Sequence, residues 1–115
     1  MKDQLFLLNP GFTDDTGQGP FYCGDSVSVE GLLSFFPALR SKVDVVYIGF
    51  TKPRAEVVSL IGAENQSIPV LVLDGPVAPD DVQFNVKVAS GKRFINTEAD
   101  IRSYLSTRHR VATAK

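Results

Sequence analysis

The 115-residue chain has one cysteine, one histidine and no tryptophan. A single cysteine, Cys23, excludes a disulfide within the chain and any zinc site built from several cysteines. The lone histidine, His109, has no identifiable nucleophile to pair with. The chain is therefore expected to hold no metal, and a reduced thiol suits a cytoplasmic protein.

An excess of one charge and long apolar runs are also missing. Twelve Lys and Arg residues against thirteen Asp and Glu residues leave a formal net charge of -1, which offers no attraction for nucleic acid or an anionic membrane surface. The apolar runs are far shorter than the roughly 18 residues of a membrane span. The first run, residues 5–8, is too short for a signal peptide. We expect a cytoplasmic protein that binds neither nucleic acid nor membrane.

Segments that favour strands and helices alternate along the first two thirds of the chain. Residues 5–8 and 70–73 are continuous apolar runs typical of buried strands, and residues 43–50 are rich in β-branched and aromatic side chains. Between them, apolar residues spaced by three and four predict a helix over residues 27–36, capped by Asp25 or Ser26. This order predicts two parallel strands joined by a right-handed crossover.

A second helix is expected after the strand at 43–50. Thr51 would cap it, Pro53 would open it and Gly62 would end it. Its apolar positions are 57, 58 and 61. The region between the strands therefore reads as helical.

The last third of the chain predicts a hairpin and a final helix. Apolar and polar residues alternate from Val82 to Val88, and a turn separates them from a second arm at residues 93–95. Which arm joins the main sheet is left open. The apolar hairpin from Val82 to Val88 offers an edge for strand pairing in a homodimer. The final helix covers residues 97–105, with Thr97 and Asp100 as a capping box, and residues 106–115 are expected to form a flexible tail of this single domain, residues 1–115.

The surroundings of Cys23 predict a reactive position. Residues 19–26 read Gly-Pro-Phe-Tyr-Cys-Gly-Asp-Ser, so the cysteine stands where a loop becomes a helix. The unpaired N–H groups and positive dipole end of a helix N-terminus favour the thiolate. The spacing Cys-x-x-Ser is a dithiol motif with oxygen in place of the second sulfur. Such a site holds a thiol or a mixed disulfide but closes no disulfide of its own.

These segments and landmarks together resemble the thioredoxin-like superfamily. The landmarks are an aromatic residue before the cysteine at the first helix, Ile68-Pro69 before the third strand, and a capped helix after the last strand. The resemblance implies an α/β protein with a thioredoxin-like fold, whose mixed sheet of four to five strands has helices on both faces. It also implies a cis peptide bond at Pro69.

Three segments narrow the resemblance. Residues 20–23 are similar to the Pro-Tyr-Cys of glutaredoxins, and residues 97–105 are similar to a segment of glutathione S-transferase N-terminal domains. Residues 29–33 and 64–71 are similar to an uncharacterised bacterial family of small thioredoxin-like proteins, which implies no activity. Gly24 and Ser26 depart from the usual Cys-Pro-x-Cys. The Lys and Gly-Gly-x-Asp of monothiol glutaredoxins are missing too.

The resemblance implies a site with glutathione as the cofactor and a thiol or disulfide, small molecule or protein, as the substrate. Cys23 would be the nucleophile and Ser26 would stabilise its thiolate. The residues that would contact the substrate are Tyr22, Ile68, Pro69, Thr97 and Glu98.

Plainer interpretations stand beside these. Ser26 and Thr97 are also suitable helix caps, and Glu98 has the wrong charge to meet a substrate carboxylate. Cys23 can also be interpreted as an ordinary, partly buried cysteine. The alternative function is therefore a binding protein that keeps the fold without redox chemistry.

Overall fold

A five-stranded mixed sheet forms the centre of the molecule. A computed structural model describes residues 2–115, and its strands lie in the order β2-β1-β3-β5-β4. The strands are β1 (Gln4–Leu8), β2 (Asp44–Ile48), β3 (Val70–Leu73), β4 (Lys87–Ala89) and β5 (Lys92–Ile95). β1 and β2 are parallel, whereas β3 is antiparallel to both β1 and β5, and β4 is antiparallel to β5.

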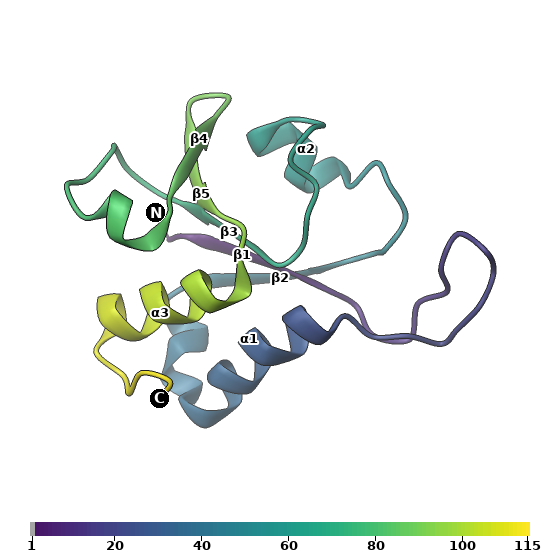
Figure 1. Cartoon of the computed structure of the whole chain (residues 1–115), viewed down its shortest axis with the longest axis horizontal. Helices are drawn as coiled ribbons and strands as arrows, with labels where there is room; N and C mark the ends of the chain where they lie inside the picture. Colours follow the sequence, from purple (N-terminus) through teal and green to yellow (C-terminus); the bar gives the residue numbers. More distant parts are fainter. Residues whose placement is uncertain (1) are drawn as a thin grey trace.

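Helices cover both faces of this sheet (Figure 1). Helices α1 (Gly24–Phe35) and α3 (Glu98–His109) lie on one face, and α2 (Ala55–Ile61) lies on the other. Two short 3-10 helices, η1 (Pro37–Ser41) and η2 (Asp81–Phe84), complete the elements. The expected mixed α/β architecture is confirmed, and α1 makes the crossover between the parallel strands β1 and β2.

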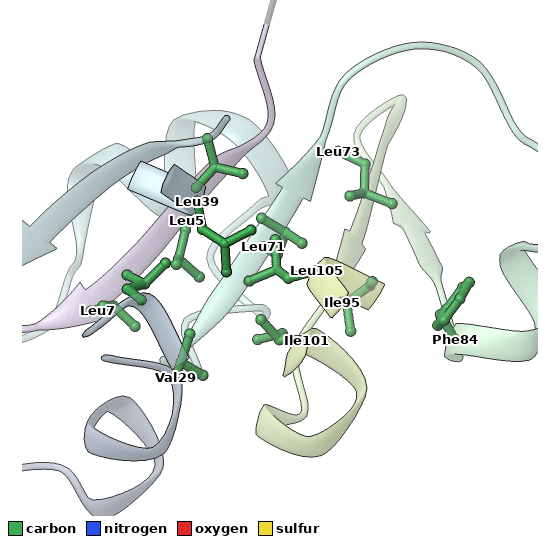
Figure 2. Close-up of a cluster of buried hydrophobic side chains, with 12 residues drawn as sticks. Leu5, Leu7, Val29, Leu39, Leu71, Leu73, Phe84, Ile95, Ile101 and Leu105 are labelled. Atoms are coloured by element: carbon green, nitrogen blue, oxygen red, sulfur yellow. The ribbon is translucent and has the colours of Figure 1, made fainter. Parts of the chain in front are cut away.

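Each face of the sheet has its own hydrophobic core, because successive strand residues point to opposite sides. Figure 2 shows the larger core, in which Leu5 and Leu7 of β1 share one cluster with residues of β3 and β5, with Val29 of α1 and with Ile101 of α3. On the other face Phe6 packs with α2 residues. Full burial of each large apolar side chain contributes about 1.5 to 3 kcal/mol.

The first two helices begin at residues other than the expected ones. Cys23, and not Asp25 or Ser26, is the N-cap of α1, so this helix starts at Gly24. Arg54 precedes α2, which starts at Ala55 after the Thr51 and Pro53 that were expected to open it. Gly62 ends α2 with a φ of 92°, as expected for a residue without a side chain.

The expected strand from Val82 to Val88 is wrong over most of its length. Residues 81–84 form η2, and only residues 87–89 form a strand. In η2 the Phe84 ring is buried edge-on against Tyr104 of α3, with ring centroids 5.2 Å apart, whereas Val82 is 88% exposed. Alternating residues satisfy a short helical turn as well as a strand, and packing on α3 selects the turn. The second arm, β5, joins the main sheet, and β4 is an edge strand.

A buried ion pair also holds η2 in place. The Arg93 Nε donates to one Asp81 carboxylate oxygen at 2.9 Å, and its Nη2 donates to the other at 2.5 Å. The Arg93 guanidinium lowers the pKa of Asp81 below its usual value, chiefly through these hydrogen bonds. The pair fastens the segment before β4 to β5.

The last helix is longer than expected. α3 ends at His109 and not at Leu105, and its cap, Arg110, has left-handed backbone angles. Ser106 is buried, and its hydroxyl donates to the Ala112 carbonyl at 3.0 Å. The chain after α3 therefore folds back on the helix. None of the helices within residues 2–115 is long and apolar enough to cross a membrane.

Candidate functional site

Cys23 is both the cap of α1 and the centre of the candidate site. Its backbone is extended, with φ -83° and ψ 116°, and its Sγ accepts a hydrogen bond from the Ser26 backbone N–H at 3.4 Å. A capping sulfur thus takes the place that an Asp or Ser oxygen usually holds. An amide directed at Sγ stabilises negative charge on the sulfur more than it stabilises the neutral thiol.

Ser26 serves the site through its backbone, while its side chain has another structural role. The Ser26 hydroxyl oxygen accepts a hydrogen bond from the Leu8 amide at 3.2 Å. Both residues are buried, so the bond ties the end of β1 to the first turn of α1. The contact between Ser26 and the sulfur is the one made by its amide.

Ile68 and Pro69 face Cys23 from the start of β3. The Ile68-Pro69 peptide bond is cis, which confirms the expectation from the sequence. The Cys23 thiol donates to the Ile68 carbonyl oxygen, with the sulfur and oxygen 3.8 Å apart. Two segments that are distant in sequence therefore meet at the sulfur.

Arg54, which the sequence interpretation missed, lies beside this meeting point and is only 8% exposed. Its guanidinium donates to the Phe50 carbonyl from Nε at 3.0 Å and from Nη2 at 2.7 Å. Its Nη1 donates to the Gln66 carbonyl at 2.6 Å. The sequence does not show which main-chain carbonyls an arginine in a loop will contact. The one local signal at Arg54 is its position between Pro53 and the start of α2.

Arg54 brings a positive charge close to the sulfur. Burial lowers the pKa of Arg54, and negative charge on Cys23 acts in the opposite direction. The guanidinium also lies over the Phe50 ring, 5.5 Å from its centroid, and Phe12 stacks on the same ring at 4.5 Å. These ring contacts and the hydrogen bonds to main-chain carbonyls fix the position of the Arg54 guanidinium.

A polar cavity of about 600 Å³ opens on the cis-proline side of the site. Lys52 and Arg54 contribute positive charges to its wall, and Asp15 and Asp25 contribute negative ones. Its other lining residues are Leu8, Phe50, Thr51, Ser67, Ile68, Pro69 and Asn96. A ligand that carries charges of both signs would find partners here.

A smaller cavity of about 280 Å³ includes Cys23 itself and is mostly apolar. Tyr22, which is 66% exposed, forms part of its wall together with Val27 and Tyr47. The Tyr47 hydroxyl donates to Glu30 at 2.5 Å and accepts from Arg40 at 3.2 Å. Leu8 lines both cavities, so they are neighbours, and Cys23 belongs to the apolar one.

Thr97 and Glu98 make their hydrogen bonds within α3. The Thr97 hydroxyl donates to the Asp100 carboxylate, which replaces the expected capping box because this hydroxyl caps no backbone amide in residues 2–115. Glu98 pairs with Arg102 one turn later at 2.7 Å. Their neighbour Asn96 reaches the polar cavity. Across residues 2–115, no three His, Cys, Asp or Glu side chains lie close enough together to hold a metal ion.

These features define a mixed α/β protein with a single cysteine at a helix start, facing a cis-proline loop. A family model described as a protein of unknown function (DUF3088) matches residues 2–113, and the chain belongs to this family. The expected membership in a family without an established activity is thereby confirmed. Comparisons with curated proteins and with solved structures found no significant match.

Proposed function

We propose that this chain is a thioredoxin-like protein of the cytoplasm, in which Cys23 acts as a monothiol nucleophile on disulfides and uses glutathione as its reductant. The observation that carries the proposal is the geometry of one sulfur. Cys23 Sγ accepts from the Ser26 amide at 3.4 Å and lies 3.8 Å from the carbonyl of Ile68, which precedes a cis-proline. The sulfur has a helix dipole behind it and a backbone dock in front of it.

The order of the strands supports the fold that this function requires. β1 is parallel to β2, β3 is antiparallel to β1, and β5 is antiparallel to β3, which is consistent with the mixed sheet of the proposed fold. In such a fold the first helix begins next to the loop before the third strand. The proximity of Cys23 to Ile68 follows from that arrangement.

The proposed reaction has two exchange steps. The Cys23 thiolate attacks one sulfur of a disulfide, a new sulfur–sulfur bond forms at Cys23, and the other sulfur leaves as a thiolate. A glutathione thiolate then attacks the substrate sulfur of the mixed disulfide, a new bond forms between that sulfur and glutathione, and Cys23 leaves as a thiolate. The Ser26 amide and Arg54 stabilise the negative sulfur before the first step and after the second.

The polar cavity supports glutathione as the small thiol. Glutathione carries an ammonium group and two carboxylates, and the cavity presents Lys52 and Arg54 together with Asp15 and Asp25. The Ile68 carbonyl accepts from the Cys23 thiol in the free protein, and it becomes an acceptor for the peptide N–H groups of glutathione once Cys23 is a thiolate. Asn96 lines this cavity, and the next two residues, Thr97 and Glu98, are proposed to contact the end of a bound glutathione.

Incubation with oxidised glutathione tests the proposal. Mass spectrometry of the intact chain should show one glutathionyl group, on Cys23, that reduced glutathione removes. The Cys23→Ser variant should show none. Lys52→Met should slow the reaction with oxidised glutathione while leaving alkylation by a small neutral reagent unchanged. The proposal fails if folded protein gains no adduct under conditions in which free cysteine does.

The apolar cavity supports a second candidate, a binding protein without redox chemistry. Tyr22, Val27 and Tyr47 expose large side chains around the sulfur, as a docking site for a protein would. In this case the Cys23→Ser variant keeps partner binding, and it restores the wild-type phenotype to a strain that lacks the gene. Loss of both partner binding and complementation in the Cys23→Ser variant would favour the redox proposal.

A further inference from the structure

The two edges of the sheet differ in how they are protected. Within residues 2–115, β2 pairs with β1 alone and β4 with β5 alone. Edge strands are usually shortened or carry lysine or proline, which discourages pairing with another chain. β4 has three residues, the first of which is Lys87. β2 has five residues with the sequence Asp-Val-Val-Tyr-Ile, without lysine or proline.

The backbone of β2 shows which of its groups face outward. The Asp44 amide donates to the Asp3 carbonyl at 2.9 Å, and the Ile48 carbonyl accepts from the Asn9 amide at 2.9 Å. In a strand, alternate residues direct both backbone groups to the same neighbour. Asp44, Val46 and Ile48 therefore face β1. The N–H and C=O groups of Val45 and Tyr47 point away from the sheet.

We propose that β2 pairs antiparallel with β2 of a second copy of this chain, about a two-fold axis at Val46. In this register Val45 lies opposite Tyr47 of the second copy, and Tyr47 lies opposite its Val45. These are the residues whose backbone groups point outward, so each pair exchanges both of its hydrogen bonds. A two-fold interface requires this kind of self-complementarity.

The charges and side chains of β2 also fit a second copy. Asp44 lies opposite Ile48 of the second copy, so the only charged residue of the strand does not face itself. Val45 and Tyr47 point to the face that α1 covers, because Val45 packs on the core of that face and Tyr47 bonds to Glu30. The aromatic ring of Tyr47 would thus pack on a β-branched side chain, a favourable cross-strand pair.

This pairing places the second copy beside the candidate site. Tyr47 lines the apolar cavity that contains Cys23. Val45 of the second copy would cover the exposed side of the Tyr47 ring and add a wall to that cavity. The dimer therefore contributes to the surroundings of the sulfur in both copies, although its formation does not depend on the redox proposal.

Sedimentation of the full chain under reducing conditions tests the dimer. The wild type should change from monomer to dimer as its concentration rises, and Cys23→Ser should behave alike, which excludes a disulfide-linked dimer. Tyr47→Lys should lower the association constant at least tenfold. Val88→Lys is the matched control on the opposite edge, where Val88 is 61% exposed, and it should leave association unchanged.

Amide exchange supplies a test that does not rely on a folded variant. The amides of Val45 and Tyr47 should exchange slowly at high concentration and quickly after dilution, whereas the Val46 amide should be protected at both. A wild type that stays monomeric at every concentration overturns the proposal. It is also overturned if Val88→Lys, and not Tyr47→Lys, dissociates the dimer, or if the Val45 and Tyr47 amides exchange at a rate independent of concentration.

Discussion

Arg54 and Gln66 are joined by two hydrogen bonds that run in the same direction. The Arg54 amide donates to the Gln66 side-chain oxygen at 2.7 Å, and the Arg54 Nη1 donates to the Gln66 carbonyl at 2.6 Å. These bonds connect the residue before α2 with the segment that leads into Ile68. They hold the Arg54 guanidinium next to the segment that contains Ile68 and Pro69.

Replacing Arg54 should slow the chemistry of Cys23. We expect Arg54→Met to lower the rate of alkylation by iodoacetamide about three- to tenfold at neutral pH, because the variant removes the positive charge that interacts with Cys23. Iodoacetamide is neutral and small, so its rate reports the sulfur and not ligand binding. Lys52→Met, which removes a charge from the same cavity, is the control and should change the rate less than twofold. Equal effects in the two variants would show that Arg54 does not act on Cys23.

Ser26→Ala should separate folding from reactivity. The variant loses the acceptor of the buried Leu8 amide, so the free energy of unfolding should fall by about 1 to 3 kcal/mol in urea titrations. The Ser26 amide still reaches the sulfur, so the alkylation rate of the folded protein should stay within about twofold of the wild type. Ser28→Ala, at an exposed position of α1, should change neither quantity. A large loss of rate with unchanged stability would assign the hydroxyl a direct role at Cys23.

The Asp81–Arg93 ion pair should be costly to break from one side. Arg93→Met leaves a buried carboxylate without its partner, and we expect the free energy of unfolding to fall by about 3 to 5 kcal/mol. The double variant Asp81→Leu and Arg93→Met should recover most of that loss, because no buried charge remains. Arg102→Met breaks a partly exposed pair with Glu98 and should cost about 0.5 kcal/mol or less. If Arg93→Met and Arg102→Met lower the free energy of unfolding by similar amounts, burial of the ion pair is not what makes its loss costly.

His109 should make stability depend on pH. Its Nε2 is buried without a hydrogen-bond partner among residues 2–115, and burial lowers the pKa of His109 below the ordinary 6.5. Asp3 opposes this effect, and Arg108 and Lys42 add to it. Below pH 6.5 the unfolded chain binds a proton that the folded chain resists. The free energy of unfolding is therefore full above that pH and falls as the pH drops through it.

Urea midpoints measured between about pH 7.5 and about pH 5.5 check this dependence, because other side chains titrate little in that window. His109→Gln should remove most of the slope. A slope that persists in this variant would place the titrating group elsewhere.

Local patterns predicted the elements whose burial is regular. The apolar run at residues 5–8 and the helical spacing of Val29 and Leu33 leave one favourable arrangement, in which β1 lies under α1. The strand predicted over residues 82–88 is wrong because alternating apolar residues also fit the 3-10 helix η2. Contacts with Arg93 and Tyr104, which are distant in sequence, select the 3-10 helix over the strand. Contacts between distant residues override local preference in such segments.

Some features of the candidate site could be predicted from the sequence, and others could not. The position of Cys23 and the cis bond before Pro69 were predictable from motifs, whereas the two roles of Ser26 were not, since its hydroxyl and amide serve different partners. Arg54 could not be assigned because its partners are main-chain carbonyls, which leave no trace in the sequence. The edge of β2 likewise became visible only with the order of the strands.

Ser26 stands one helical turn after Cys23 with its hydroxyl already bonded to Leu8, and the chain has no other cysteine. Under the proposed chemistry, a group attached to Cys23 stays there until a thiol arrives from solution. The lifetime of the adduct is then a second-order quantity that scales with the concentration of external thiol. The fraction of protein that carries an adduct on Cys23 would therefore report the ratio of oxidised to reduced thiols in the surrounding solution.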